Sequence, residues 1–256
     1  MTITLPRRAL PGLVLPAAAP AAAAEEELAH VGRGTERIAF LLYPGFTALD
    51  VFGPHNMLAG LMPAALDLVA ATAEPVVTDT GFRVVPTKTF AELEAGLDVI
   101  CVPGGTEGTL AAMRDAATLD LLRRHAASAR YVTAVCTGSL VLGAAGLLRG
   151  RRATGHWVAR DLLALFGATP VEARVVTDGQ LVTGAGVTAG MDFGLGLVAA
   201  MRGATYAKAV QLVAEYHPEP PFDAGTPDRA PAGVTRQMRE MFEPFQAAVR
   251  EIAAGR

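Results

Sequence analysis

The sequence predicts an α/β protein built around a doubly wound, mostly parallel sheet. Short apolar runs alternate with segments of helical periodicity along residues 36–256, which is the pattern of strands joined by crossover helices. The 256-residue chain is 51% hydrophobic and 18% charged, with a net charge of −3. This composition suits one sizeable hydrophobic core and excludes a disordered or nucleic-acid-coating protein.

Residues 1–24 differ from this domain. Arg7 and Arg8 precede an apolar, Ala- and Pro-rich stretch that ends in small residues before Glu25, which is a signal-peptide pattern with twin-arginine character. The stretch is too short and too broken by prolines for a transmembrane helix, so we expect no stable membrane insertion. We predict a periplasmic or otherwise exported protein; a cytoplasmic protein with an Ala/Pro-rich leader is the alternative.

The first elements follow from apolar runs and turn residues. Residues 36–44 are almost continuously apolar, as in a strand buried on both faces. Residues 50–61 have helical spacing, with Pro54 near the start, where proline is tolerated. A second strand at 66–71 and a hairpin pairing 76–77 with 84–85 follow.

The centre of the chain repeats this alternation. Residues 98–102 form a third buried strand that ends at Pro103, and 109–127 are expected to be one helix. The β-branched run 131–135 is a strand, and 137–148 have the apolar spacing of an amphipathic helix.

The remaining elements are predicted in the same way. They are a helix at 156–166, a strand pair at 174–177 and 180–183, a helical region at 187–216 broken near Gly203, a proline-rich loop at 218–231, and a helix at 234–254 that Pro244 should kink or split.

Cys136 lies where the strand 131–135 meets the following helix. The unpaired N–H groups and the dipole of a helix N-terminus favour negative charge, and thiolate is the reactive form of cysteine. Cys136 is therefore a candidate nucleophile; a small buried core cysteine is the alternative. Ligands of such sheets bind at the carboxyl ends of strands, where the segments 45–50 and 103–106 also lie.

Four residues near those strand ends complete the candidate site. The N–H groups of Gly104, Gly105 and Thr137 could form an oxyanion-hole-like nest. Asp50 is either a carboxylic acid beside the thiol or a charge stabilising its own helix.

His156 is either a base for Cys136 or a residue at a helix entry. Cys101, in the middle of a strand, is expected to be core. The sequence contains no CxxC or HExxH spacing, so no metal site is expected.

Five segments resemble the ThiJ/PfpI superfamily of class I glutamine amidotransferase-like proteins, and within it the isonitrile hydratases. They are YPGFTALDVFGP at 43–54, VPGG at 102–105, VCTGSLVLGAAGLL at 135–148, ATGHW at 153–157 and PFDAG at 221–225. The resemblance implies a flavodoxin-like three-layer sandwich with a nucleophile elbow, a homodimer and no cofactor. It also implies a nucleophilic Cys136, an acidic partner Asp50 and a contribution from Thr137.

Departures from the superfamily pattern narrow the expected function. Peptidases of the superfamily carry His where this chain has Thr137, and typically Glu where it has Asp50. Related transcription regulators append a helix-turn-helix module, whereas only one helical segment follows the loop 218–231, so no nucleic-acid partner is expected.

The resulting prediction is an enzyme that adds water to a small isonitrile, giving an N-substituted formamide through a thioimidate on Cys136. Two alternatives stay open. One is a ligand-binding or redox stress-sensing protein without turnover, and the other is a small-amide hydrolase that would use His156 as its base.

Overall fold

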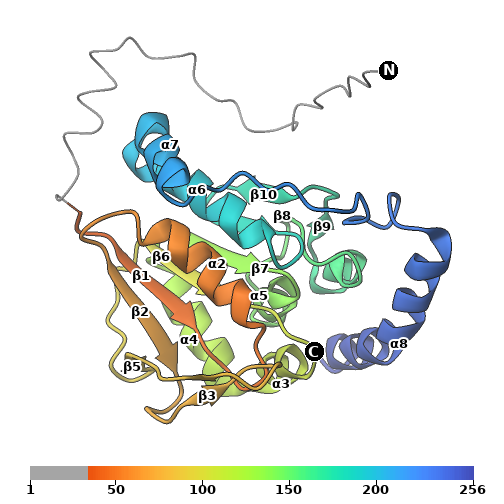
Figure 1. The fold of residues 1–256 in the computed structure, drawn as a ribbon. Helices are drawn as coiled ribbons and strands as arrows, with labels where there is room; N and C mark the ends of the chain where they lie inside the picture. Colours follow the sequence, from red (N-terminus) through yellow and green to blue (C-terminus); the bar gives the residue numbers. More distant parts are fainter. Residues whose placement is uncertain (1–33) are drawn as a thin grey trace, which may run out of the picture.

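A seven-stranded sheet in the order β10-β11-β7-β6-β1-β2-β5 lies at the centre of the computed structural model, which describes residues 34–256 (Figure 1). The predicted leader, residues 1–24, lies outside the described residues. The strands are β1 (Arg37–Leu41), β2 (Ala65–Ala70), β5 (Lys88–Thr89), β6 (Val99–Val102), β7 (Tyr131–Val135), β10 (Val175–Asp178) and β11 (Leu181–Gly184). All neighbours pair in parallel except β10 and β11.

Helices cover both faces of the sheet. One group consists of α2 (Ala48–Leu58), α6 (Ala189–Arg202) and α7 (Ala204–Val213), which pack against one another. The other consists of α3 (Glu107–Arg114), α4 (Ala116–Ala126) and α5 (Gly138–Ala144), extended by the 3₁₀ helix η1 (Arg160–Phe166) and by α8 (Ala232–Ala254). The sheet lies between the groups (Figure 1), so the predicted α/β fold with a mostly parallel sheet and flanking helices is confirmed.

The core explains why the central strands read as unbroken apolar runs. All four residues of β6 are buried, as are the last four of both β1 and β7. Cys101 in β6 is fully buried, as predicted. Among residues 34–256, no helix is long and apolar enough to cross a membrane.

Several predicted helices have different bounds in the structure; the helix expected at 50–61, for example, is α2, Ala48–Leu58. The helix expected at 109–127 is two helices, because Asp115 ends α3 and caps α4 by accepting a hydrogen bond from the Thr118 N–H at 2.9 Å. The elbow helix α5 ends at Ala144 rather than at Leu148. The helix expected at 156–166 forms only the 3₁₀ helix η1, which Gly167 ends with a φ of 78°.

The later elements are mostly as predicted. The break at Gly203 and the hairpin of β3 (Val76–Val77) with β4 (Arg83–Val84) are confirmed. Pro244 was predicted to kink or split the last helix. Helix α8 is continuous through Pro244, so no split occurs, and its ribbon bends along its length (Figure 1). The two-residue strands β5, β8 (Arg152–Ala153) and β9 (Thr169–Pro170) were not predicted, because such short segments show no periodicity.

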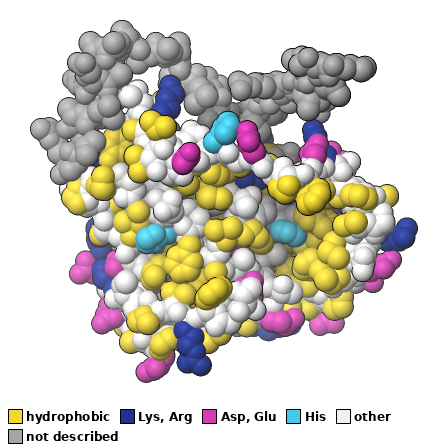
Figure 2. All heavy atoms as spheres, in the orientation of Figure 1, with side chains coloured by type: hydrophobic (Ala, Val, Ile, Leu, Met, Phe, Trp, Pro, Cys, Tyr) yellow, Lys and Arg dark blue, Asp and Glu magenta, His cyan; other side chains and the backbone are white. Residues whose placement is uncertain are grey.

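Figure 2 shows one face of the molecule, on which α2 lies. Apolar side chains gather over its middle and charged side chains lie mainly around its rim. Two apolar residues of the first turns of α2, Leu49 and Phe52, are 41% and 39% exposed.

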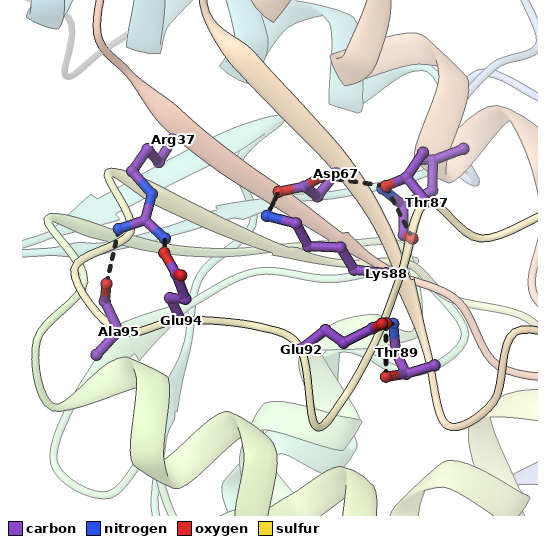
Figure 3. Close-up of polar contacts among 9 residues, drawn as sticks. Arg37, Asp67, Thr87, Lys88, Thr89, Glu92, Glu94 and Ala95 are labelled. Atoms are coloured by element: carbon purple, nitrogen blue, oxygen red, sulfur yellow. Dashed lines mark hydrogen bonds and ion pairs between the residues drawn. The ribbon is translucent and has the colours of Figure 1, made fainter.

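The unpredicted edge strand β5 is held by polar contacts rather than by an apolar run (Figure 3). Lys88 forms an ion pair of 2.9 Å with Asp67 of β2, and the Thr87 hydroxyl donates to the same carboxylate at 3.2 Å. Arg37 of β1 reaches Glu94 in the segment that returns from β5 to the sheet. The partly exposed Lys88 and Asp67 give the sheet a polar edge, which discourages pairing with another chain.

Candidate active site

Cys136 lies on a sharp turn between β7 and α5. Its φ of 60° is in the left-handed region, which is uncommon for a residue other than glycine. Two backbone hydrogen bonds hold it there: the Cys136 N–H donates to the Gly184 carbonyl at 3.2 Å, and its carbonyl accepts from the His156 N–H at 3.1 Å. This strained strand-to-helix turn is the geometry of a nucleophile elbow.

A glycine lets the elbow approach the end of β6. A Cβ on Gly138 would lie 2.4 Å from the Val102 carbonyl oxygen and 2.5 Å from that of Pro103, closer than any side-chain carbon can pack. The absence of a side chain therefore brings the N-terminus of α5 against the turn that contains Gly104 and Gly105. Two of the three predicted strand-end segments meet here.

Asp50, in the first turn of α2, is fully buried. Its Oδ2 accepts a hydrogen bond of 2.7 Å from the Gly104 N–H. Oδ1 has no hydrogen-bond partner among residues 34–256, while the Cys136 thiol lowers the pKa of the carboxyl as a donor to it. Burial raises the pKa of Asp50 to about 7, against the opposing effect of these two donors.

The pKa of the Cys136 thiol is also raised, first by burial and then by the charge of Asp50. The N–H and hydroxyl groups of Thr137 lower it, but by less. The Thr137 N–H at the helix N-terminus thus favours thiolate, as predicted, but burial and Asp50 outweigh it. A raised pKa favours the protonated thiol, and Asp50 is the carboxyl that acts on it most strongly.

The Thr137 hydroxyl is held by Gly105 and Thr109. It accepts from the Gly105 N–H at 3.0 Å and donates to the Gly105 carbonyl at 2.7 Å. The amides expected to form an oxyanion nest are thus both engaged, that of Gly105 by Thr137 and that of Gly104 by Asp50. Of the three predicted donors, the Thr137 N–H is the one that acts on the Cys136 sulfur.

His156 contacts the elbow through its backbone. Its Nδ1 accepts from the Val158 N–H at 3.4 Å, and its ring lies 5.8 Å from that of Trp157 and 6.0 Å from that of Phe242. Burial lowers the pKa of the imidazole, which is therefore neutral near pH 7. The groups acting most strongly on the thiol are Asp50 and Thr137, so the structure supplies no contact that makes His156 its base.

Two buried residues beside the site were not predicted. Thr109 lies 2.8 Å from Thr137, oxygen to oxygen, and the Tyr43 hydroxyl donates to the Pro103 carbonyl at 2.5 Å. Tyr43 directly follows the first strand region, and the strand-end rule could have found it. Thr109 looks like any other residue of a helix. Within the described part of the chain, no cluster of three or more His, Cys, Asp or Glu could hold a metal ion.

Comparison with known proteins gives the relatives of this chain. The profile of the DJ-1/PfpI family matches residues 36–200. Isonitrile hydratase from Pseudomonas putida is 52% identical over 208 residues, covering 81% of this chain and 90% of that protein. The transcriptional regulator CdhR from Pseudomonas aeruginosa is 32% identical over 171 residues, which cover 64% of this chain and 50% of the regulator.

Similar solved structures come from the same family. A ThiJ/PfpI family protein from Pseudomonas syringae has a TM-score of 0.84 at 52% identity, covering 86% of this chain and 91% of its own. A DJ-1 superfamily protein from Salmonella typhimurium has a TM-score of 0.64 at 28% identity, covering 72% of this chain and 100% of its own. The nucleophile elbow, the sheet order and these matches lead to one conclusion: the chain belongs to the DJ-1/PfpI family.

Proposed function

We propose that this protein is an isonitrile hydratase, which adds water to a small isonitrile and releases an N-substituted formamide. The observation that carries the proposal is the buried Asp50 carboxyl beside the Cys136 thiol, with Thr137 next to it. The 52% identity to the hydratase of Pseudomonas putida supports the same reaction. No cofactor takes part in the proposed reaction.

The first step uses the proton shared by Cys136 and Asp50. The thiol gives its proton to the Asp50 carboxylate, whose raised pKa of about 7 makes it an effective acceptor. The resulting acid protonates the terminal carbon of the isonitrile while the thiolate attacks the same carbon. One C–H and one C–S bond form, the C≡N bond becomes C=N, and a thioimidate is bound to Cys136.

Hydrolysis completes the cycle. Water adds to the thioimidate carbon, and Asp50 takes one proton from the water and passes it to the substrate nitrogen. As the tetrahedral adduct collapses, its hydroxyl becomes the formamide C=O, the C–S bond breaks, and the hydroxyl proton passes through Asp50 to the sulfur. The sum is one isonitrile and one water giving one formamide, with Cys136 and Asp50 regenerated. Thr137 supports both steps, because its N–H and hydroxyl stabilise negative charge on the sulfur.

The decisive experiment is incubation of the purified protein with cyclohexyl isonitrile and quantification of the formamide by chromatography. Cys136→Ala should abolish formation of the product. Cys101→Ala is the matched control. It removes the other cysteine of the chain, which lies in the fully buried strand β6, and it should retain activity. Full activity of Cys136→Ala would rule out the covalent mechanism.

The same assay separates the two alternatives. A redox sensor would form a reversible sulfenic acid on Cys136 at low peroxide and produce no formamide. A small-amide hydrolase would release ammonia from short amides. Production of formamide that depends on Cys136 favours the hydratase over both.

We also propose that the protein is a homodimer, as expected for the family. The exposed apolar residues Leu49 and Phe52 on α2 support burial of this face against a second copy. Light scattering coupled to size-exclusion chromatography tests this by measuring the mass in solution. A mass of one chain across the micromolar range would contradict it.

Export is a separate proposal, based on residues 1–24. The Arg7-Arg8 pair and the apolar stretch that follows support the twin-arginine route. Fractionation of cells and N-terminal sequencing of the recovered protein test it. An uncleaved protein in the cytoplasm would favour the alternative.

A further inference from the structure

A chain of buried hydroxyl groups leads from the elbow into the core. Thr137 and Thr109 are 2.8 Å apart, oxygen to oxygen, and Thr109 lies 3.4 Å from the Tyr43 hydroxyl. All three side chains are buried, and Thr109 is completely inaccessible. Thr109 comes from α3, Tyr43 follows β1 and Thr137 begins α5, so the chain joins three separate elements behind the site.

The hydroxyl protons in this chain can be placed by elimination. The Gly105 carbonyl can only accept, so at 2.7 Å the Thr137 hydroxyl must donate to it. Thr137 then has no proton left for Thr109, and the 2.8 Å contact requires Thr109 to donate to Thr137. Tyr43 likewise donates to the Pro103 carbonyl at 2.5 Å. The directions of all three hydroxyls are therefore fixed, and the 3.4 Å contact between Tyr43 and Thr109 is left without a proton.

This arrangement occupies both lone pairs of the Thr137 oxygen. One receives the Gly105 N–H at 3.0 Å and the other receives the Thr109 hydroxyl. A hydroxyl that already accepts two hydrogen bonds can only donate to any further group. The incoming bonds also polarise it and strengthen it as a donor.

We infer that Thr109 is a positioning residue for the Cys136 thiol, because its hydroxyl makes Thr137 a donor, and never an acceptor, toward the sulfur. When the thiolate forms, the Thr137 proton can turn from the Gly105 carbonyl to the sulfur. Without Thr109, a lone pair of Thr137 becomes free to accept from the Cys136 S–H, which stabilises the unreactive thiol. In the hydratase reaction, this role rests on the proposed function; for the reactivity of the thiol it stands alone.

The test measures the pH dependence of Cys136 alkylation by iodoacetamide, followed on the Cys136 peptide by mass spectrometry. Thr109→Val removes the hydroxyl and keeps the shape of the side chain, because a methyl group replaces it. Thr109→Ala removes the hydroxyl without adding a methyl group. We expect both to raise the midpoint by about 0.5–1 pH unit, a three- to tenfold slower alkylation at fixed pH below the midpoint. Thr109→Ser should restore the wild-type midpoint.

Thr118→Val is the matched control. Thr118 is also a buried threonine near a helix N-terminus, and its hydroxyl donates to Asp115 rather than toward the elbow. We expect it to lower stability without moving the alkylation midpoint. A wild-type midpoint in both Thr109→Val and Thr109→Ala would overturn the inference, and so would a Thr109→Ser midpoint shifted as far as theirs.

The kinetics of isonitrile hydration provide a second test of the role of Thr109. Thr109→Val should lower kcat for cyclohexyl isonitrile while KM stays within about twofold, because Thr109 acts on the thiol and not on substrate binding. A wild-type protein that hydrates no isonitrile would defeat the proposed function alone. The alkylation profiles would still decide the role of Thr109.

Discussion

The backbone N–H of Gly104 donates a hydrogen bond to Oδ2 of Asp50 across 2.7 Å. This bond ties the start of α2 to the end of β6 and fixes the plane of the carboxyl. Oδ1 has no hydrogen-bond partner among the described residues, and the Cys136 thiol is the other donor that acts on the carboxyl. A backbone group, rather than a side chain, therefore holds the acid of the site in place.

Gly104→Ala should damage the site sterically. A Cβ at this position would lie 2.6 Å from both the N and Oγ1 of Thr137, and 2.9 Å from Oδ2 of Asp50. Relief would require movement of the acid or of the elbow. We expect at least a tenfold loss of kcat/KM, since displacement of a catalytic group by about 1 Å costs on the order of 100-fold.

Gly196→Ala is the control for that substitution. Gly196 lies within α6, and a Cβ added there would have no neighbouring atom within 4 Å. Alanine at this position should stabilise the helix by about 0.5–1 kcal/mol and leave hydration unchanged. Wild-type kinetics for Gly104→Ala would show that the site accommodates a Cβ here without displacing Asp50 or the elbow.

Asp115→Ala should destabilise the fold by about 1 kcal/mol, because it removes the side-chain cap of α4. The carboxylate accepts from both the N–H of Thr118, at 2.9 Å, and its hydroxyl, at 2.6 Å. Asp115→Asn keeps an acceptor oxygen and should recover most of the loss. Urea denaturation of the three proteins measures it, and equal stability of wild type and Asp115→Ala would contradict it.

Asp115 also illustrates what the sequence could predict. The apolar spacing of 109–127 continues across it, so periodicity alone predicted one helix, and the break is visible only through the cap. The central strands were predictable because burial on both faces leaves a continuous apolar run. The strands β5, β8 and β9 depend on pairing partners far along the chain, which a local pattern does not contain.

The candidate site also has a part that the sequence could predict and a part that it could not. The strand-end rule brought Cys136, Gly104 and Asp50 together from the sequence, and the structure places them in contact. Which amides would be free was not predictable, because the Gly105 N–H is used by a side chain 32 residues away. The raised pKa of the thiol likewise depends on how deeply the folded chain buries it.

Asp50→Asn should change how stability depends on pH. Burial raises the pKa of the folded-state carboxyl from 3.8 to about 7, so the unfolded chain ionises first. The wild type therefore loses stability as pH rises from about 4 to 7, by an amount on the order of a few kcal/mol. Asparagine stays neutral and can still accept from the Gly104 N–H.

Urea denaturation at pH 4.5 and pH 8 tests this prediction. We expect Asp50→Asn to resemble the wild type at pH 4.5 and to be more stable than it at pH 8. Asp161→Asn is the control, because the Asp161 side chain is 87% exposed and its replacement should change little at either pH. A pH 8 stability of Asp50→Asn at or below that of the wild type would show that ionised Asp50 carries no burial penalty.

The dependence of kcat/KM on pH should reflect how many protons Cys136 and Asp50 hold together. The reactive form of the pair holds one proton, which can lie on the thiol or on the carboxyl. Below the Asp50 pKa of about 7 the pair holds two protons, so thiolate becomes scarce and kcat/KM should fall about tenfold per pH unit. The pKa of the thiol is raised well above 9, so the rate should form a plateau from about pH 7.5 to 9. Asp50→Asn should remove the limb near pH 7, so that only ionisation of the thiol itself, at higher pH, still affects the rate. It should also lower the rate by orders of magnitude, because asparagine neither takes the thiol proton nor delivers it to the substrate carbon. Measurement of kcat/KM with cyclohexyl isonitrile across this range checks both parts, and a limb that stays near pH 7 in Asp50→Asn would assign it to a different group.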